Sequence, residues 1–427
     1  MRQTKCLLVL GALSVLFLAS SIATSSDKNN VSANNPMEME RLEARIKNLE
    51  EKLTKKNASF KINGFINASF ARSDDDSLTE SWGGITNESD FGSLSKVGIQ
   101  LSFSPNPSTQ ITTQLVSRGE EEWGMEAEWA YLSFKPSNSL TLRFGRQKAS
   151  LYLLSEYIEV GYANPWIYAP DEVYGITGDS TYDGVTLLYT IPGNQWDTTL
   201  QGMWGNNYFY TAVAGDVTLN DMISLSLTSR SEHFTLRLGY NVVTGNLPDV
   251  SVPLPTIPGS PIVAGDTLNF TALESDIRYL TVGIIHDNDR WLLMSEYAQL
   301  EIDSWFPDVT GAYLMAGYRF GKAMPHFTIA KMSNQDPGAR DIATVVRSSV
   351  TLALPDGVAG SIADASMVQN QTTYTLGMRY ELLPAVSLKA ELSHITDFDG
   401  SGGQFLGSSP PTKESVNILK FSIDSVF

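Results

Sequence analysis

The chain has 427 residues and a formal net charge of −17, from 47 acidic and 30 basic side chains. This acidic balance argues against nucleic acid as a partner. A mean hydropathy of −0.11 is typical of soluble proteins, but it does not exclude a membrane barrel, because half of every barrel strand faces water.

Residues 1–23 have the pattern of a cleaved secretory signal. The basic residues Arg2 and Lys5 precede an apolar stretch from Leu7 to Leu18, and small residues follow. This stretch is shorter than the roughly 20 residues that span a bilayer as a helix, and no later run is longer. We therefore expect an exported chain without a transmembrane helix. Since Cys6 is the only cysteine, the mature chain is expected to have no disulfide and no cysteine metal site.

A polar spacer, residues 24–36, leads to a helical pattern over residues 37–56. Apolar side chains recur there at alternating intervals of three and four residues, and charged side chains cover the other faces. An amphipathic helix lying on the rest of the protein would show the same pattern. We favour a short coiled coil. Two heptads alone are too few to hold an oligomer together, so the following domain would have to supply the remaining association energy. The seam residues are Met39, Leu42, Ile46, Leu49 and Leu53.

Residues 60–427 predict an all-β fold, a closed antiparallel transmembrane barrel. Segments of about ten residues alternate apolar and polar side chains, enough for a tilted strand to cross a bilayer. In residues 96–104, for example, Val97, Ile99 and Leu101 share one face. The count is about sixteen strands, an even number that returns both ends of the domain to one side. Aromatic residues expected at the outward strand ends are Trp129 or Tyr131, Trp196, Tyr240, Trp291, Tyr297 and Tyr380.

Short and long connections alternate between these segments. Short turns on one side and long loops on the other are typical of a barrel with periplasmic turns and outer loops, whereas a soluble sandwich or propeller has similar turns on both sides. The expected long loops are 72–94, 119–126, 149–181, 206–218, 246–275, 302–309, 334–370 and 396–413.

The loop 149–181 is the candidate for narrowing the pore. A barrel of sixteen strands has a lumen too wide for side chains to fill. This loop is rich in tyrosine and leucine, and folding into the lumen would cover them; packing on the outer rim or at a subunit contact remains an alternative. If the loop folds inward, it brings acidic side chains to the constriction, namely Glu156, Glu159, Asp171 and Glu172.

Basic side chains are expected on the lumen wall opposite this loop. Acid on the loop facing base on the wall would give a transverse field that orients polar solutes. Each assignment depends on strand register, and Arg146 on the apparent lipid face indicates a bulge near Gly145 or the onset of the loop there. By strand parity the wall residues are Arg118, Arg143, Arg237, Arg319, Arg379, Lys389 and Lys420.

The last twelve residues carry the clearest resemblance to a known family. Leu419, Phe421 and Ile423 lie on one face of this segment, and the chain ends on Phe427. It resembles outer-membrane barrel proteins, in which a last strand that closes on Phe is the signal read by the barrel-insertion machinery.

Residues 60–427 as a whole resemble the trimeric porins of Gram-negative outer membranes, and the helical segment 37–56 resembles the subgroup with an N-terminal periplasmic coiled coil. The resemblance implies a homotrimer in contact with outer-membrane lipid and lipopolysaccharide. It also implies passive diffusion of small hydrophilic solutes.

Other functions stay open beside the general porin. The same barrel could be a substrate-specific channel for small carboxylates or sugars, or a plugged, adhesive barrel. An enzyme is disfavoured: His394 lies near Asp397 and Asp399 but no activated serine accompanies it, and the other histidines lie beside short turns. Since no phosphate loop, zinc spacing or nucleotide fingerprint occurs, we expect no cofactor and no metal.

Overall fold

The computed structural model describes residues 58–76, 84–177, 181–211, 215–247, 249–253, 263, 265–270, 273–303, 307–335, 344–347, 350–352, 368–399, 401–405 and 413–427. The expected signal (1–23), spacer (24–36) and heptad helix (37–56) lie outside these ranges. Within the described ranges, no helix is long and apolar enough to cross a membrane.

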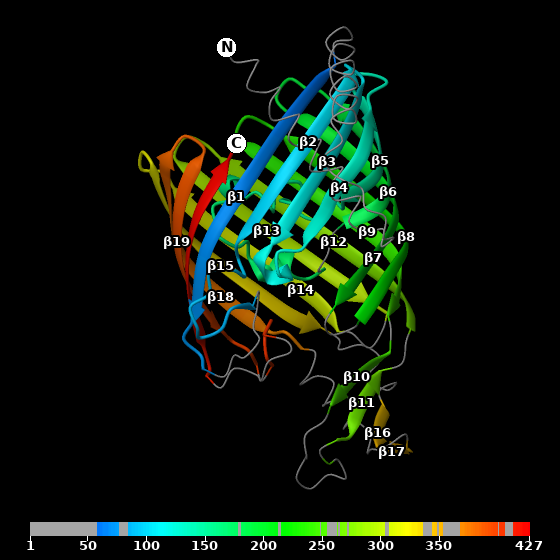
Figure 1. Cartoon of the computed structure of the whole chain (residues 1–427), viewed down its shortest axis with the longest axis vertical. Helices are drawn as coiled ribbons and strands as arrows, with labels where there is room; N and C mark the ends of the chain where they lie inside the picture. Colours follow the sequence, from blue (N-terminus) through cyan, green and yellow to red (C-terminus); the bar gives the residue numbers. More distant parts are fainter. Residues whose placement is uncertain are drawn as a thin grey trace, which may run out of the picture. The chain divides into compact units, whose positions relative to one another are not determined.

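Sixteen strands of the described part close into one antiparallel barrel, which confirms the predicted fold class and strand number (Figure 1). Strand β1 pairs with β20, Phe65 opposite Val426, and this pairing closes the ring. In ring order the strands are β1 (Ser59–Ser73), β2 (Lys96–Asn106), β3 (Thr109–Arg118), β4 (Met125–Phe134), β5 (Leu140–Lys148), β6 (Thr181–Ile191), β7 (Asp197–Thr211), β8 (Gly215–Arg230), β9 (Phe234–Leu247), β12 (Leu273–Asp287), β13 (Trp291–Ile302), β14 (Asp308–Tyr318), β15 (Ala323–Gln335), β18 (Gln371–Leu383), β19 (Val386–Thr396) and β20 (Val416–Val426).

Connections alternate in length around most of this ring, as the sequence predicts. Turns of a few residues join β2 to β3, β4 to β5 and the following pairs at what we call the turn end, where Phe427 also lies. The prediction of a long loop at residues 206–218 is wrong. Strands β7 and β8 continue through it, pairing Asn207–Thr211 with Gly215–Leu219 after a register shift at Gly205. The aromatic run in this stretch of β7 favours an extended, paired strand over a loop.

A separate four-stranded sheet forms within two connections that were expected to be plain loops, 246–275 and 334–370. Its strands are β10 (Val250–Pro253), β11 (Thr267–Phe270), β16 (Thr344–Arg347) and β17 (Val350–Leu352), in the order β10-β11-β16-β17. The pairing of β11 with β16 joins segments more than seventy residues apart, and a pattern read along the chain does not reveal such a contact.

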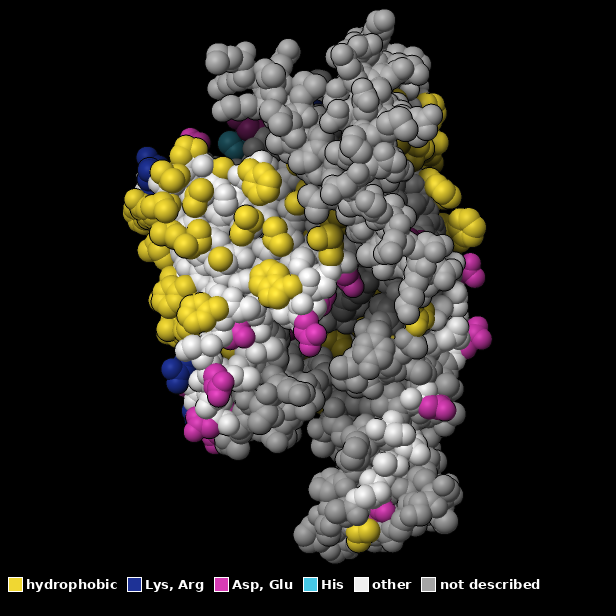
Figure 2. Space-filling view, in the orientation of Figure 1, with side chains coloured by type: hydrophobic (Ala, Val, Ile, Leu, Met, Phe, Trp, Pro, Cys, Tyr) yellow, Lys and Arg dark blue, Asp and Glu magenta, His cyan; other side chains and the backbone are white. Residues whose placement is uncertain are grey.

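The outward face of the barrel is apolar. Trp204 and Leu225 are each 60% exposed, and Figure 2 shows hydrophobic side chains spread over the strands, with acidic side chains beyond them. At the turn end, the rings of Trp291 and Tyr318 lie 4.7 Å apart, an aromatic edge of the kind that lies at a membrane interface.

The expected outward position of Trp129 or Tyr131 is wrong. Between β3 and β4, Gln114 pairs with Trp129 and Leu115 with Ala127, so the strand carries one extra residue. A bulge of this kind reverses the side-chain alternation beyond it. Tyr131 accordingly lines a cavity inside the barrel.

The expected bulge or loop onset near Gly145 is also wrong, since β5 continues to Lys148. Strands β5 and β6 pair without a register shift, and Arg146 stays on the outer face, where it forms an ion pair with Asp183 at 2.8 Å. The irregularity lies in the backbone of Gly145 itself, whose φ is +123°, and a Cβ there would lie 2.3 Å from the carbonyl oxygen of Ala130. Glycine is the one residue that adopts this conformation without a steric penalty.

Candidate functional site: a loop held across the barrel lumen

Segment 149–177 contacts inward-facing residues on opposite walls of the barrel. Its Glu159 lies 3.0 Å from Arg118 of β3, and its Leu153 donates a backbone hydrogen bond of 2.7 Å to Glu296 of β13. Strands β3 and β13 are the third and eleventh in a ring of sixteen, half a turn apart. The segment contains a 3-10 turn, Gly161–Ala163, and the short helix α3, Asp171–Tyr174.

One half of the inner wall is apolar, and the loop packs against it. Met294 and Met315, on β13 and β14, belong to a buried cluster that also contains Leu154, Trp166 and Val173 of the loop. These three loop side chains are at most 2% exposed. Burying a side chain of this size stabilises by about 2 kcal/mol, so this contact explains the apolar sequence of the loop.

Hydrogen bonds from two aromatic side chains of the loop to wall residues fix the orientation of these side chains in the packing. The indole of Trp166 donates to the hydroxyl of Thr328 on β15 at 2.8 Å. The hydroxyl of Tyr174 donates to Glu296 at 2.6 Å. Burial, reinforced by the charge of Glu296, raises the pKa of Tyr174 well above its usual value, and the phenol therefore keeps its proton.

A second wall carboxylate, Glu391 of β19, receives the loop backbone at another point. It accepts from the amide of Ile167 at 2.7 Å and pairs with Lys420 at 2.8 Å. Neither Glu296 nor Glu391 was among the predicted site residues. The only sequence signal was their inward parity on strands β13 and β19, because a backbone N–H partner leaves no trace in the sequence.

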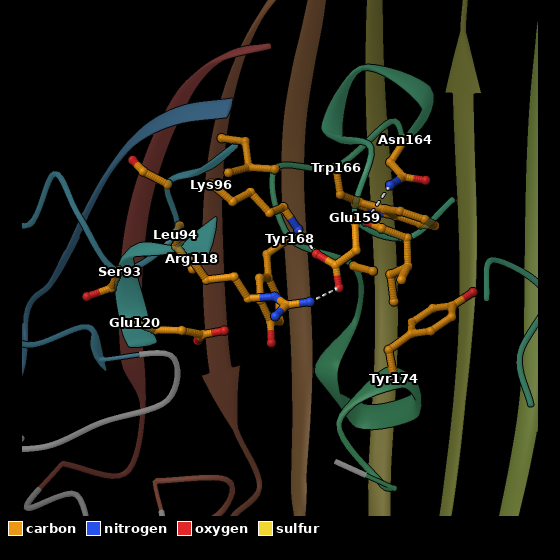
Figure 3. Close-up of a pocket in the computed structure, with 14 residues that line it drawn as sticks. Ser93, Leu94, Lys96, Arg118, Glu120, Glu159, Asn164, Trp166, Tyr168 and Tyr174 are labelled. Atoms are coloured by element: carbon orange, nitrogen blue, oxygen red, sulfur yellow. Dashed lines mark hydrogen bonds and ion pairs between the residues drawn. The ribbon is translucent and has the colours of Figure 1, made fainter. Parts of the chain in front are cut away.

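Glu159 lies in a cluster of charges. Its carboxylate is 3.1 Å from Lys96, 3.0 Å from Arg118 and 3.1 Å from Lys148, and Figure 3 shows Lys96 and Arg118 converging on it. Glu128 of β4 pairs with Arg118 and also with Lys148, at 2.9 Å from the latter. Burial alone would raise the pKa of Glu159, but the three cations hold it well below its usual value of 4.5.

The other predicted loop acids lie in different surroundings. Glu172 accepts a hydrogen bond of 2.7 Å from Gln371 and another from Thr373, both on β18. Asp171 is 8% exposed, and its charge, together with burial, raises the pKa of Tyr168 well above the usual value. Glu156 is exposed and lines a cavity.

Three of the predicted wall cations, Lys389, Arg237 and Arg379, donate hydrogen bonds to the loop backbone. Lys389 donates to the carbonyl oxygens of Gly161 and Trp166, at 2.7 Å each. Arg237 donates to the carbonyl and the hydroxyl of Ser150, the latter at 2.6 Å. The structure therefore brings these side chains against the loop.

Arg379 and Arg319 lie closer to the turn end. Arg379 donates to the carbonyl of Asn164 at 2.9 Å, and its guanidinium lies 4.9 Å from the ring centre of Tyr162. Arg319 pairs with Asp287 at 2.6 Å. Both line a cavity of about 480 Å³, whose apolar floor includes Met294.

A smaller, polar cavity of about 230 Å³ lies between loop residues 150–157 and the walls formed by β3 to β9. Arg143 lines it, with its guanidinium 5.2 Å from the ring centre of Tyr131. A third cavity of about 110 Å³ lies beside the Glu159 cluster (Figure 3).

The histidines show no catalytic arrangement within the described ranges. The ring of His394 contacts Asn417 at 2.8 Å. His326 is buried with its Nε2 4.0 Å from Glu391, and neither of its ring nitrogens has a hydrogen-bond partner there. In this part of the chain, no group of three or more His, Cys, Asp or Glu side chains is arranged to hold a metal ion.

No protein-family model and no curated protein sequence matches the chain. Solved structures do match. OmpT of Vibrio cholerae, an outer-membrane protein, is 14% identical with a TM-score of 0.53, and the match covers 87% of this chain and 98% of that one. The chain has a porin-type barrel fold.

Two further structures share this fold. The anion-selective porin from Comamonas acidovorans is 14% identical with a TM-score of 0.52, over 87% of this chain and 100% of that one. OmpF of Salmonella typhi, in complex with daunomycin, is 12% identical with a TM-score of 0.53, over 87% and 99%. At such identities the likeness concerns the fold alone.

Proposed function

We propose that the protein is an outer-membrane porin, a channel through which small hydrophilic solutes diffuse passively. The observation that carries this proposal is the sidedness of the barrel wall. Outward side chains such as Leu225 and Trp204 are apolar, whereas the lumen holds arginines, lysines and carboxylates around cavities of about 110 to 480 Å³. A wall with these two faces suits lipid outside and water inside.

The loop 149–181, of which the structure describes residues 149–177 before β6 begins, is the proposed constriction. Its contacts with β3 on one side and β13 on the other support this role, since they divide the lumen into cavities of about 110, 230 and 480 Å³. The proposed loop acids are Glu156, Glu159, Asp171 and Glu172, and the proposed wall cations are Arg118, Arg143, Arg237, Arg319, Arg379 and Lys389. Several of these cations anchor the loop, so the passage beside it is narrow and admits small solutes only.

The proposed assembly is a homotrimer in the Gram-negative outer membrane, with residues 60–427 as the barrel and residues 37–56 as a periplasmic coiled coil after the signal (1–23) and spacer (24–36). One matching structure, 12% identical, is a trimer form of Vibrio cholerae OmpT. Phe427 is the proposed insertion signal; its backbone exchanges hydrogen bonds of 2.9 Å with Gly64, which ties the chain end into the barrel wall.

Solute flux into vesicles tests this function. The purified protein is reconstituted into liposomes, which are then diluted into iso-osmotic solutions of sugars of increasing mass. We expect swelling rates that fall steeply with solute size. Equal rates in protein-containing and empty liposomes, with the protein shown to be folded, would overturn the proposal.

A further inference from the structure

Cationic side chains crowd the polar cavity of about 230 Å³ between loop residues 150–157 and the barrel wall. Glu156 is the one carboxylate among the described residues that line it, and the other charged residues there are Lys135, Arg143, Arg230 and Arg237. This excess of positive charge contrasts with the net charge of −17 for the whole chain.

These cations lack the acidic partners that other arginines of the barrel have. Within the described ranges, no ion pair joins Arg143, Arg230 or Lys135 to a carboxylate. Arg143 instead stacks on the ring of Tyr131 at 5.2 Å. By contrast, Arg118 pairs with Glu128 and Glu159, and Arg319 and Arg146 each pair with an aspartate.

Arg237, on the inner face of β9, is a buried cation beside the same cavity. The residue is 8% exposed, and its hydrogen bonds go to neutral acceptors, the hydroxyl of Thr228 and the backbone and hydroxyl of Ser150. Its Nε is buried without a partner. Burying a charged group without a close counter-ion is destabilising, and an anion bound in the cavity would lower this cost through its charge.

The acids that would otherwise neutralise this cavity are held elsewhere. Glu159 is surrounded by Lys96, Arg118 and Lys148, and Glu172 is bonded to Gln371 of β18. Most of the negative charge of the loop therefore lies away from the cavity that Arg143 lines.

We propose that this cavity binds small oxoanions carrying two negative charges and makes the pore prefer anions. The inference rests on the proposed channel function and names its substrate class. Guanidinium groups recognise phosphate and carboxylate oxygens through paired hydrogen bonds, and the hydroxyls and amides of Ser133, Thr199 and Gln201 line the same cavity. Binding is weak and reversible, since a solute in a conducting channel must also leave.

The test is electrical and uses the full-length protein in a planar bilayer. The reversal potential in a KCl gradient gives ion preference, and block of the chloride current by added inorganic phosphate or succinate, at constant ionic strength, gives binding. The variants are Arg143→Gln, Arg230→Gln and the double change. Arg146→Gln is the matched control, because Arg146 lies on the outer face beside Asp183.

We expect the wild-type channel to prefer anions. Phosphate, succinate or both should block its chloride current, and this block should saturate as the concentration of the added anion rises. Each cavity variant should weaken the block about fivefold to tenfold, the effect of one unit charge a few ångströms from a dianion in a water-filled site. Arg146→Gln should match the wild type, and Arg143→Lys, which keeps the charge, should retain most of the anion preference. Block by only one of the two probes identifies the preferred oxoanion group.

A conducting wild type without anion preference overturns the anion site and leaves the porin intact. A block that is equally strong in the double variant overturns it as well. A silent wild type, folded and inserted, overturns the channel function itself. Folding of each variant is checked by its heat-modifiable migration on gels, and if one of the two single Gln variants fails to fold, the other gives the result.

Discussion

Replacing Glu159 by glutamine should release the loop from the β2–β3 side of the lumen. The change keeps the shape of the side chain but removes the charge that Lys96, Arg118 and Lys148 share at 3.0 to 3.1 Å. These side chains are 10 to 18% exposed, so solvent screens the cluster only weakly. Removing one partner from a buried ion cluster of this kind costs about 3 kcal/mol.

A loss of about 3 kcal/mol shifts the balance between docked and undocked loop by a factor of roughly 150. The rest of the loop should stay in place, since Glu296, Glu391 and Lys389 still bind its backbone. Current recorded from single channels reports this shift directly. We expect Glu159→Gln to show frequent transitions to a higher conductance that are rare in the wild type.

Glu121→Gln is the matched control for this experiment. Glu121 contacts the same Arg118 at 3.3 Å, but its side chain is 39% exposed. Exposed pairs contribute at most about 1 kcal/mol, and its recordings should resemble those of the wild type. If Glu159→Gln and Glu121→Gln behave alike, the cluster does not hold the loop and the reasoning is refuted.

Three further outcomes follow from the same contacts. In the docked loop the pKa of Glu159 is lowered, so the charged carboxylate stabilises docking fully above pH 4.5, and this stabilisation is lost only as the pH falls through the lowered pKa. Conductance should therefore stay constant from pH 8 to 5. A loop-opening transition between pH 5 and 7 would contradict this. Glu296→Ala leaves two buried donors without their acceptor, a loss of about 2 kcal/mol, and should make the loop cleavable by protease in the folded barrel, whereas equal resistance would count against the anchor. Gly145→Ala forces a Cβ against the carbonyl of Ala130 at a positive φ and should lower the melting temperature, while Gly202→Ala, with no neighbour nearer than 3.7 Å, should not.

The sequence predicted much of the barrel because side-chain alternation is a local signal. The strand number, the alternating turn and loop lengths and the apolar outer face all follow from a period of two and from turn residues. The prediction was wrong where geometry departs from that period. The extra residue Glu128, between Ala127 and Trp129, turned Tyr131 inward, and the irregularity expected in the pairing near Gly145 lies in the backbone of that glycine instead.

The loop site was harder to predict, since its contacts join residues far apart in the chain. Inward parity was enough to propose Arg237 and Lys389, but not that they would bind carbonyl oxygens of the loop. Glu296 and Glu391 were missed because their partners are backbone amides. The continuation of β7 and β8, and the sheet of β10, β11, β16 and β17, likewise depend on pairing partners that a single sequence does not reveal.

Single-channel recording of the purified wild type in potassium chloride tests the central claim most directly. An open barrel should insert with discrete, stable current steps, grouped in threes if the protein is a trimer. Folded and inserted protein that carries no current would contradict the channel function and favour a plugged barrel.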